Sequence, residues 1–240
     1  MKKLLYILLL VVPFSVYSAG AEVELEDADI DLSDVQSLER GAKNYVTYCL
    51  GCHSAKHIRY KRMAIDLNLD EDKVLQDIAP LGAGIYDQMH SAMNAKDAAK
   101  WFGTTPPDLS LIARVRGADW LYTYLRSFYA DPSRPYGVNN RVFEDVGMPN
   151  VLWQLQGEQT ASIKNIDGKP VITELVSKGN GKMSKKEFDR FVNDLVNFLV
   201  YIGEPVQMER KAMGKYVLFY ILLFTIVAYL LKREYWKDIH

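Results

Sequence analysis

Five consecutive residues, Cys49-Leu50-Gly51-Cys52-His53, carry the most specific chemistry in this chain of 240 residues. The spacing C-x-x-C-H is typical of the attachment site of a c-type haem. The thiols of Cys49 and Cys52 can bond to the vinyl groups on one edge of the porphyrin, and His53 can offer a neutral imidazole nitrogen to the iron. Because the sequence holds no other cysteine, we expect one covalent haem c and no disulfide.

Two other kinds of site use a pair of cysteines at this spacing. A structural zinc site needs further ligand pairs, and a chain with two cysteines does not supply them. A thiol-redox motif belongs beside a βαβ pattern, which the sequence does not show. Covalent haem is therefore the preferred interpretation.

The iron also needs a sixth ligand or an open site. A thioether sulfur raises the reduction potential and suits electron transfer. Met148 lies in Gly147-Met148-Pro149, where a loop-borne methionine can face a haem, although a lone methionine more often fills a core. The residue pattern alone leaves several candidates open: Met63, Met89, Met93, Met148 and Met183, with His57 and His90 as rivals.

The N-terminus has the features of a secretory signal peptide over residues 1–21. Lys2 and Lys3 precede an apolar run from Leu4 to Val12, and the small residues Ala19-Gly20-Ala21 suit a cleavage site. An uncleaved N-terminal anchor is the alternative. Export agrees with the cysteine motif, because haem c is attached outside the cytoplasm.

A second apolar segment, Tyr216 to Leu231, contains sixteen residues without a charge. It is shorter than the ~20 residues of a typical spanning helix, but Lys215 and Lys232 can snorkel to the interfaces. We expect a C-terminal transmembrane anchor and a short cytoplasmic tail over residues 208–240. A buried core helix is the alternative. The exported haem domain then covers residues 22–207.

Helices dominate the predicted haem domain. The 3.6-residue period predicts helices from Val35 to Tyr48, with Ser33 or Asp34 as the cap, and from Lys185 to Ile202 behind a capping box. Gly41 falls inside the first helix and suggests that the second approaches it closely. A third helix is predicted from about Ala118 to Tyr129, and one hairpin is predicted from Ser162–Ile166 and Pro170–Val176. The fold class is mainly α.

Charge adds two expectations. With 29 basic and 30 acidic residues, the composition gives no support for nucleic-acid binding. The segment from Glu22 to Asp34 is strongly acidic. It is either a solvated arm or a surface that attracts a basic partner.

Four segments together resemble cytochrome c1, the haem subunit of the cytochrome bc1 complex. They are Cys49-Leu50-Gly51-Cys52-His53-Ser54, Pro106-Pro107-Asp108-Leu109-Ser110 followed by Arg114-Val115-Arg116, Gly147-Met148-Pro149, and Asn197-Phe198-Leu199 through Glu204-Pro205. Their order and spacing agree from about Leu38 to Lys232. The stretch from Asp131 to Gly147 is short compared with mitochondrial members, which indicates a bacterial, short-chain form.

The resemblance implies a class I cytochrome-c-like haem domain. It implies that His53 and Met148 are the axial ligands. Pro106 and Pro107 would line the haem, and one proline carbonyl would accept the imidazole proton. Arg116 would pair with a haem propionate, as arginine does well with carboxylates.

The implied function is electron transfer in ubiquinol–cytochrome c reductase, a proton-translocating oxidoreductase. The chain would take electrons from the Rieske iron–sulfur protein and pass them to a soluble or membrane-bound c-type cytochrome. It would sit beside cytochrome b in a dimeric complex of the bacterial inner membrane, with its haem domain in the periplasm. It would not be an enzyme on its own, because no bond is made or broken in it.

Two other classes share some of these features. A membrane-anchored monohaem cytochrome of a terminal oxidase shares the export, haem and anchor, but not the Pro-Pro-Asp-Leu-Ser segment. A haem enzyme such as a peroxidase needs an open sixth site, which a bound Met148 would exclude.

Overall fold

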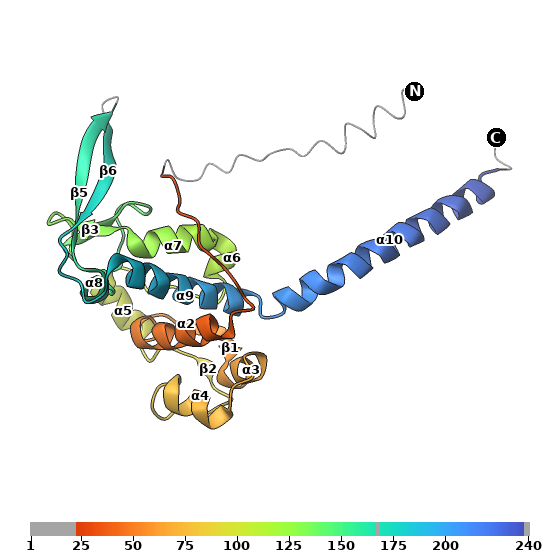
Figure 1. The fold of residues 1–240 in the computed structure, drawn as a ribbon, viewed down its shortest axis with the longest axis horizontal. Coiled ribbons are helices and arrows are strands. Elements are labelled where there is room, and N and C mark those ends of the chain that lie inside the picture. The colour runs from red at the N-terminus through yellow and green to blue at the C-terminus, as the bar shows by residue number, and fades with distance from the viewer. Residues whose placement is uncertain (1–22, 167–168, 238–240) are drawn as a thin grey trace.

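The computed structural model describes residues 23–166 and 169–237. The predicted signal peptide therefore lies outside the described residues. Two helices, α2 (Val35–Tyr48) and α9 (Lys185–Gly203), pack side by side at the centre of the fold (Figure 1). Both begin where the sequence predicts them. The Asp34 carboxylate accepts a hydrogen bond from the backbone N–H of Ser37 and caps α2, and a capping box of Ser184 and Glu187 begins α9.

Gly41 permits the close packing of α2 on α9, as its place in the sequence suggests. A Cβ atom at Gly41 would lie 2.1 Å from the carbonyl oxygen of Asp194 and 2.7 Å from the Cβ of Phe198. Buried Leu38, Ala42 and Tyr45 share this face of α2 and form the core with the buried residues of α9.

Polar contacts tie the same two helices together. The Asp194 carboxylate on α9 accepts hydrogen bonds from the Ser37 hydroxyl at 2.7 Å and from the Arg40 guanidinium at 2.6 and 2.8 Å. Asp194 is buried, and a buried charge needs such partners. The network fixes the rotation of α2 against α9 as well as the distance between them.

Two further helices, α6 (Ile112–Arg116) and α7 (Ala118–Arg126), pack against α9. The predicted continuation of α7 to Tyr129 is wrong. The chain leaves the helix at Ser127, because Phe128–Ala130 form β3 and pair with β4 (Val138–Asn140). The Asn140 side chain supports this turn by donating to the carbonyl oxygen of Tyr124 at 2.8 Å.

The predicted hairpin is present and its strands are longer than expected. Strands β5 (Gln159–Ile166) and β6 (Lys169–Ser177) pair in antiparallel fashion and project from the helices (Figure 1). The sequence did not predict the other two small antiparallel sheets, β3–β4 and β1–β2 (Ala55–Arg59 with Gln88–Met89). Strand β2 has two residues and pairs with a strand distant along the chain, so it leaves no local pattern. Shorter helices among the described residues are α3 (Tyr60–Asp66), α4 (Glu71–Asp77), α5 (Ala95–Phe102) and α8 (Trp153–Gln156).

The described part of the acidic segment is an extended strap bound to the helices. Backbone N–H groups of Glu26, Ala28 and Asp29 donate to side chains on α7 and α9 at 2.8 to 3.0 Å. The Glu26 carboxylate also pairs with Arg126 of α7. The segment is therefore held against the fold, with its other carboxylates exposed.

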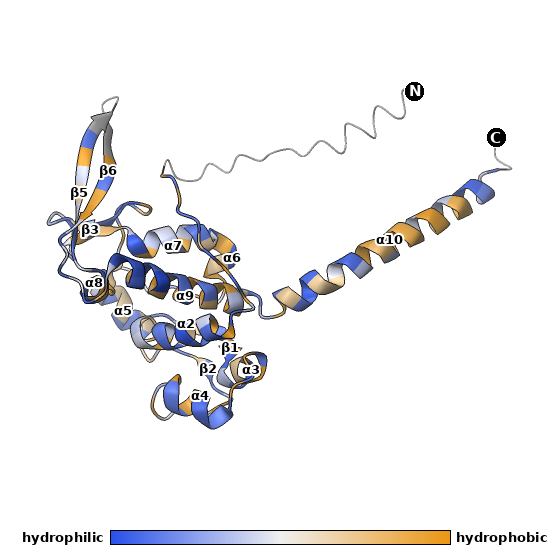
Figure 2. Ribbon diagram, in the orientation of Figure 1, coloured by the Kyte–Doolittle hydropathy of each residue, from blue (hydrophilic) through white to orange (hydrophobic). Residues whose placement is uncertain are grey.

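The last helix, α10 (Gln207–Tyr235), projects away from the rest of the chain (Figure 1). None of its residues is buried, and its middle is a continuous hydrophobic band (Figure 2). It is the one helix among the described residues that is long and apolar enough to cross a membrane. The mainly α architecture with a C-terminal apolar helix is confirmed.

Candidate haem site

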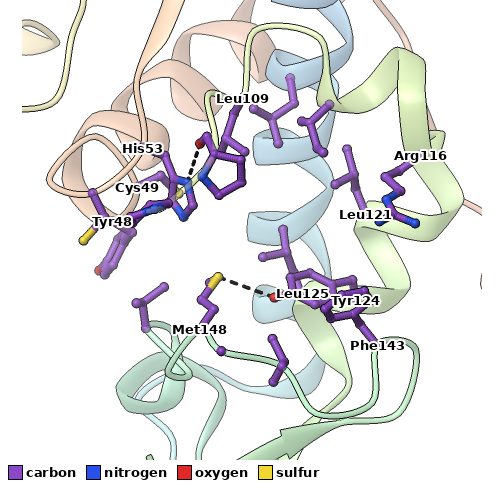
Figure 3. A pocket seen from close by; sticks show the side chains of 18 of the residues that line it. Tyr48, Cys49, His53, Leu109, Arg116, Leu121, Tyr124, Leu125, Phe143 and Met148 are labelled. Carbon is purple, nitrogen blue, oxygen red and sulfur yellow. Dashed lines mark hydrogen bonds between the residues drawn. The ribbon is translucent and has the colours of Figure 1, made fainter. Parts of the chain in front are cut away.

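A cavity of about 290 Å³ opens between the end of α2, the helices α6, α7 and α9, and the loop that carries Met148 (Figure 3). Apolar side chains form most of its wall, and Leu195 and Leu199 of α9 are among them. All seven residues expected at the haem line it: Cys49, Cys52, His53, Pro106, Pro107, Arg116 and Met148. Segments that are far apart in the sequence, from Cys49 to Leu199, therefore meet at one site.

The end of α2 delivers the attachment motif. Cys49 directly follows the helix, and its carbonyl oxygen accepts hydrogen bonds from the backbone N–H of Cys52 at 3.0 Å and of His53 at 2.8 Å. This turn brings both thiols and the imidazole to the same cavity. Burial raises the pKa of the Cys49 thiol to about 12. A redox dithiol needs a lowered pKa, so the environment argues against that alternative.

The His53 ring is held by a proline carbonyl. Nδ1 of His53 lies 2.8 Å from the carbonyl oxygen of Pro107, and a carbonyl can only accept, so Nδ1 carries the proton. The other nitrogen, Nε2, then keeps a free lone pair for a metal. Burial lowers the pKa of His53, despite the opposing effect of the Pro107 hydrogen bond. His53 is therefore a neutral imidazole with a fixed tautomer, as an iron ligand must be.

The rest of the Pro-Pro-Asp-Leu-Ser segment is bound to the chain that follows His53. The backbone N–H of Leu109 donates to the Ser54 carbonyl at 2.8 Å. The Asp108 carboxylate accepts from the N–H of Lys56 at 3.2 Å, and the Ser110 hydroxyl accepts from the N–H of His57 at 3.1 Å. The prediction gave no role to Asp108 and Ser110. The D-x-S spacing, typical of a local turn, was the available signal.

Met148 lies on the facing side of the cavity from His53 (Figure 3). Its loop runs between β4 and α8, so its side chain is not committed to a helix. The Tyr124 hydroxyl of α7 donates a hydrogen bond to the Met148 Sδ at 3.5 Å. Met63 and Met89 are instead fully buried in the core. The cavity wall includes neither these two nor the other candidates Met93, Met183, His57 and His90.

Arg116 lies at the end of α6, on the cavity wall opposite Cys49 (Figure 3). Its guanidinium stacks over the Trp120 ring at 4.9 Å and near the Phe143 ring at 5.8 Å from the centroids. Within the described part of the chain, Arg116 has no ion-pair partner, whereas Arg114 pairs with Glu204. Its charge is therefore available to an anionic group in the cavity.

Three aromatic residues of α7 separate into two groups. Trp120 and Tyr124 line the cavity and stack on each other, with 4.9 Å between centroids and 9° between planes. Tyr122 does not line the cavity and lies under the Arg126 guanidinium, at 4.5 Å.

This donor set fits a c-type haem. It offers two thiols for the vinyl groups, a neutral imidazole and a thioether on facing sides, and an apolar wall for the ring. It also offers the Arg116 guanidinium, which has no ion-pair partner among the described residues, for a propionate.

Comparison of the sequence with known proteins identifies its family. A sequence model described as "Cytochrome C1 family" matches residues 29–239. The chain is 48% identical to "Cytochrome c1" of Allochromatium vinosum, covering 100% of this chain and 99% of the relative. It is also 48% identical to "Ammonia monooxygenase gamma subunit" of Nitrosomonas europaea, covering 100% and 99%. A mitochondrial "Cytochrome c1, heme protein" of Neurospora crassa is 28% identical over 85% of this chain and 62% of the relative. The chain belongs to the cytochrome c1 family.

Proposed function

We propose that this chain is the electron-transfer subunit of a bacterial cytochrome bc1 complex, with one haem c bound through Cys49 and Cys52. The observation that carries the proposal is the placement of His53 and Met148 on facing sides of one apolar cavity, beside both cysteines. A bound haem supplies a one-electron couple. His53 and Met148 would both bind the iron, and an iron with two protein ligands favours electron transfer over chemistry at the metal.

The residues of the chain tune and orient the group. Pro107 fixes the His53 tautomer and makes the imidazole more basic. The Met148 thioether favours reduced iron and raises the potential. Arg116 would pair with a haem propionate, and Pro106 would limit the access of water beside His53. No bond to a substrate is formed or broken, so the oxidoreductase activity belongs to the whole complex.

The proposed partners follow from family membership. Electrons would arrive from a Rieske iron–sulfur protein and leave to a soluble or membrane-bound c-type cytochrome. Helix α10 would cross the bacterial inner membrane beside cytochrome b and hold the haem domain in the periplasm. The proposed signal peptide at residues 1–21 would direct this export.

The relative from Nitrosomonas europaea carries a name that points to a different complex. Among the described residues, no group of three or more His, Cys, Asp and Glu side chains is placed to hold a metal ion. A monooxygenase metal centre therefore has no support in this part of the chain. Purification from its native membrane decides between the two contexts: we expect cytochrome b and a Rieske protein to accompany this chain, and co-purification with other monooxygenase subunits instead would overturn the assignment.

Replacement of Met148 tests the site itself. In Met148→Leu the haem should stay covalently attached, but the reduction potential should fall sharply, because the thioether that favours reduced iron is lost. The near-infrared sulfur-to-iron band of the oxidised protein should disappear. Met63→Leu is the matched control, since Met63 is fully buried outside the cavity. A band that survives in Met148→Leu would remove Met148 from the iron.

A further inference from the structure

The connection between the haem domain and α10 is short. Helix α9 ends at Gly203 and α10 begins at Gln207, so Glu204, Pro205 and Val206 are the whole link. No residue of α10 is buried against the rest of the described chain. Packing therefore does not set the angle between the haem domain and α10, and the contacts at the link must do so.

One carboxylate joins three helices at this link. Glu204, which follows α9, accepts hydrogen bonds from Arg210 in the first turns of α10, at 2.5 Å from Nε and 3.0 Å from Nη2. It also accepts from the Arg114 guanidinium of α6 at 2.5 Å. Among the described residues, no side-chain hydrogen bond other than those from Arg210 joins α10 to the haem domain.

The Glu204 carboxylate is well suited to this role. Its side chain is 14% exposed, while the two arginine side chains are more than half exposed. The Arg210 hydrogen bonds, followed by those of Arg114, lower the pKa of Glu204 to about 2 against the opposing effect of burial. The group is thus charged at physiological pH. A bidentate arginine contact within a network holds its geometry better than an isolated surface pair.

The contact between Glu204 and Arg114 also connects α10 with residues around the haem cavity. Arg114 packs closely against Gly203 at the end of α9. A Cβ added at Gly203 would lie 3.4 Å from the Arg114 Cγ and 3.6 Å from the Ser110 carbonyl oxygen. Ser110 belongs to the segment that holds His53. Arg116, which lies on the same short helix as Arg114 (α6), lines the cavity. Movement of α10 at the link is therefore opposed by the residues that surround the haem site.

We propose that Glu204 is a positioning residue that clamps α10 to the haem domain through Arg210 and Arg114, and so fixes the tilt of the haem relative to the membrane. A membrane-bound electron donor meets a haem edge at one height and one orientation, and the clamp keeps the edge there. The inference rests on the proposed haem site and on α10 as the membrane span.

The angle of the haem to the membrane tests the clamp directly. Full-length haem-loaded protein is placed in stacked lipid bilayers, and the electron paramagnetic resonance of the oxidised haem is recorded against the angle between field and membrane normal. We expect a narrow angular distribution for the natural protein and a distribution at least twofold wider for Glu204→Gln. Glu158→Gln is the control, since Glu158 pairs with Lys178 at an exposed site near the hairpin.

A second variant keeps the test decisive if Glu204→Gln does not fold. Arg210→Gln should widen the distribution to a similar extent, and the double variant should be no wider than either single one. Unchanged haem spectra would show that the site itself is intact. Equal distributions for natural protein and both variants would overturn the clamp but leave the proposed function standing. Natural protein that carries no haem would instead overturn the proposed function, and the clamp with it.

The assembled complex provides a functional readout. In Glu204→Gln, reduction of the haem by quinol through the complex should slow several-fold, because the haem edge no longer stays in position for its donor. Reduction by ascorbate from solution should keep its rate, since a small reductant needs no fixed orientation. Equal slowing of both reactions would show damage to the haem site and contradict a positioning role.

Discussion

Gly41→Ala tests how closely α2 and α9 are packed. Helix propensity and the clash of the new Cβ with α9 change the stability of the protein in opposite directions and by different amounts. Alanine is favoured over glycine inside a helix by ~1 kcal/mol. Helix propensity alone therefore predicts a more stable protein. The new Cβ, however, would lie 2.1 Å from the Asp194 carbonyl oxygen and 2.7 Å from the Phe198 Cβ.

The size of the clash decides the sign. Overpacking a core costs ~1–3 kcal/mol when side chains can shift. Here the nearest atom belongs to the backbone of α9, so the helices themselves must separate, and we expect a cost above ~3 kcal/mol. Subtracting the propensity gain leaves a net loss of at least ~2 kcal/mol. For a domain of this size that corresponds to a drop in Tm of at least ~4–8 °C.

Thermal unfolding of the full-length protein in detergent, followed by circular dichroism in the haem Soret band, measures this loss. Thr47→Ala is the control, because Thr47 lies on the exposed side of the same helix. It should change stability by no more than ~0.5 kcal/mol. A Tm for Gly41→Ala that equals or exceeds that of the natural protein would refute the close helix contact.

Three further predictions concern the site, the link and the strap. Tyr124→Phe should keep the sulfur-to-iron band but lower the reduction potential, because the Met148 sulfur regains the electron density that the hydroxyl withdraws; redox titration against Tyr122→Phe, which lies outside the cavity, checks it. Glu204 has a pKa of about 2 in the folded protein against an ordinary 4.5, so its stabilisation is complete above about pH 5 and declines as the pH falls toward 2. The Tm difference between natural protein and Glu204→Gln should therefore shrink between pH 6 and pH 3, and a constant difference would contradict the ion pair. In the strap, the exposed Glu24, Asp27 and Asp29 can be changed to amides, while Glu26 is kept because it pairs with Arg126. Stopped-flow experiments should then show slower association with a basic acceptor cytochrome and a weaker dependence of that rate on salt. An unchanged salt slope would show that the strap takes no part in acceptor binding.

Local patterns were sufficient for the central helices and for the attachment motif. Helix α2 begins at its cap and ends just before Cys49 as predicted, because capping and the apolar stripe are local properties of the chain. The chemistry of C-x-x-C-H is likewise contained in five residues. Pro107, Arg116 and Met148 could be placed at the haem only through the resemblance to a family, since residues alone left the sixth ligand open.

Contacts between segments that lie far apart in the chain could not be predicted from the sequence. Asp108 and Ser110 hold the chain after His53, and Glu204 joins Arg114 to Arg210, but no periodic pattern marks such pairs. Strand β2 went unrecognised for the same reason, because its partner lies far along the chain. Helix α7 was predicted to be too long, because Phe128 and Tyr129 have the apolar character of a helix face. In the structure these two residues belong to β3 and form backbone pairs with β4 instead.

The two proposed iron ligands are held by different parts of the fold, and α9 connects them. His53 is fixed by the end of α2 and by the Pro107 carbonyl, while Met148 is on a loop steadied by Tyr124 of α7. Both α2 and α7 pack on α9, so the space between the ligands depends on how closely each helix approaches it. Gly41 sets that approach for α2. Gly41 does not line the cavity, but its contact with α9 helps to set the distance between the two proposed ligands. Its replacement should therefore disturb the proposed Met148–iron contact before it unfolds the protein.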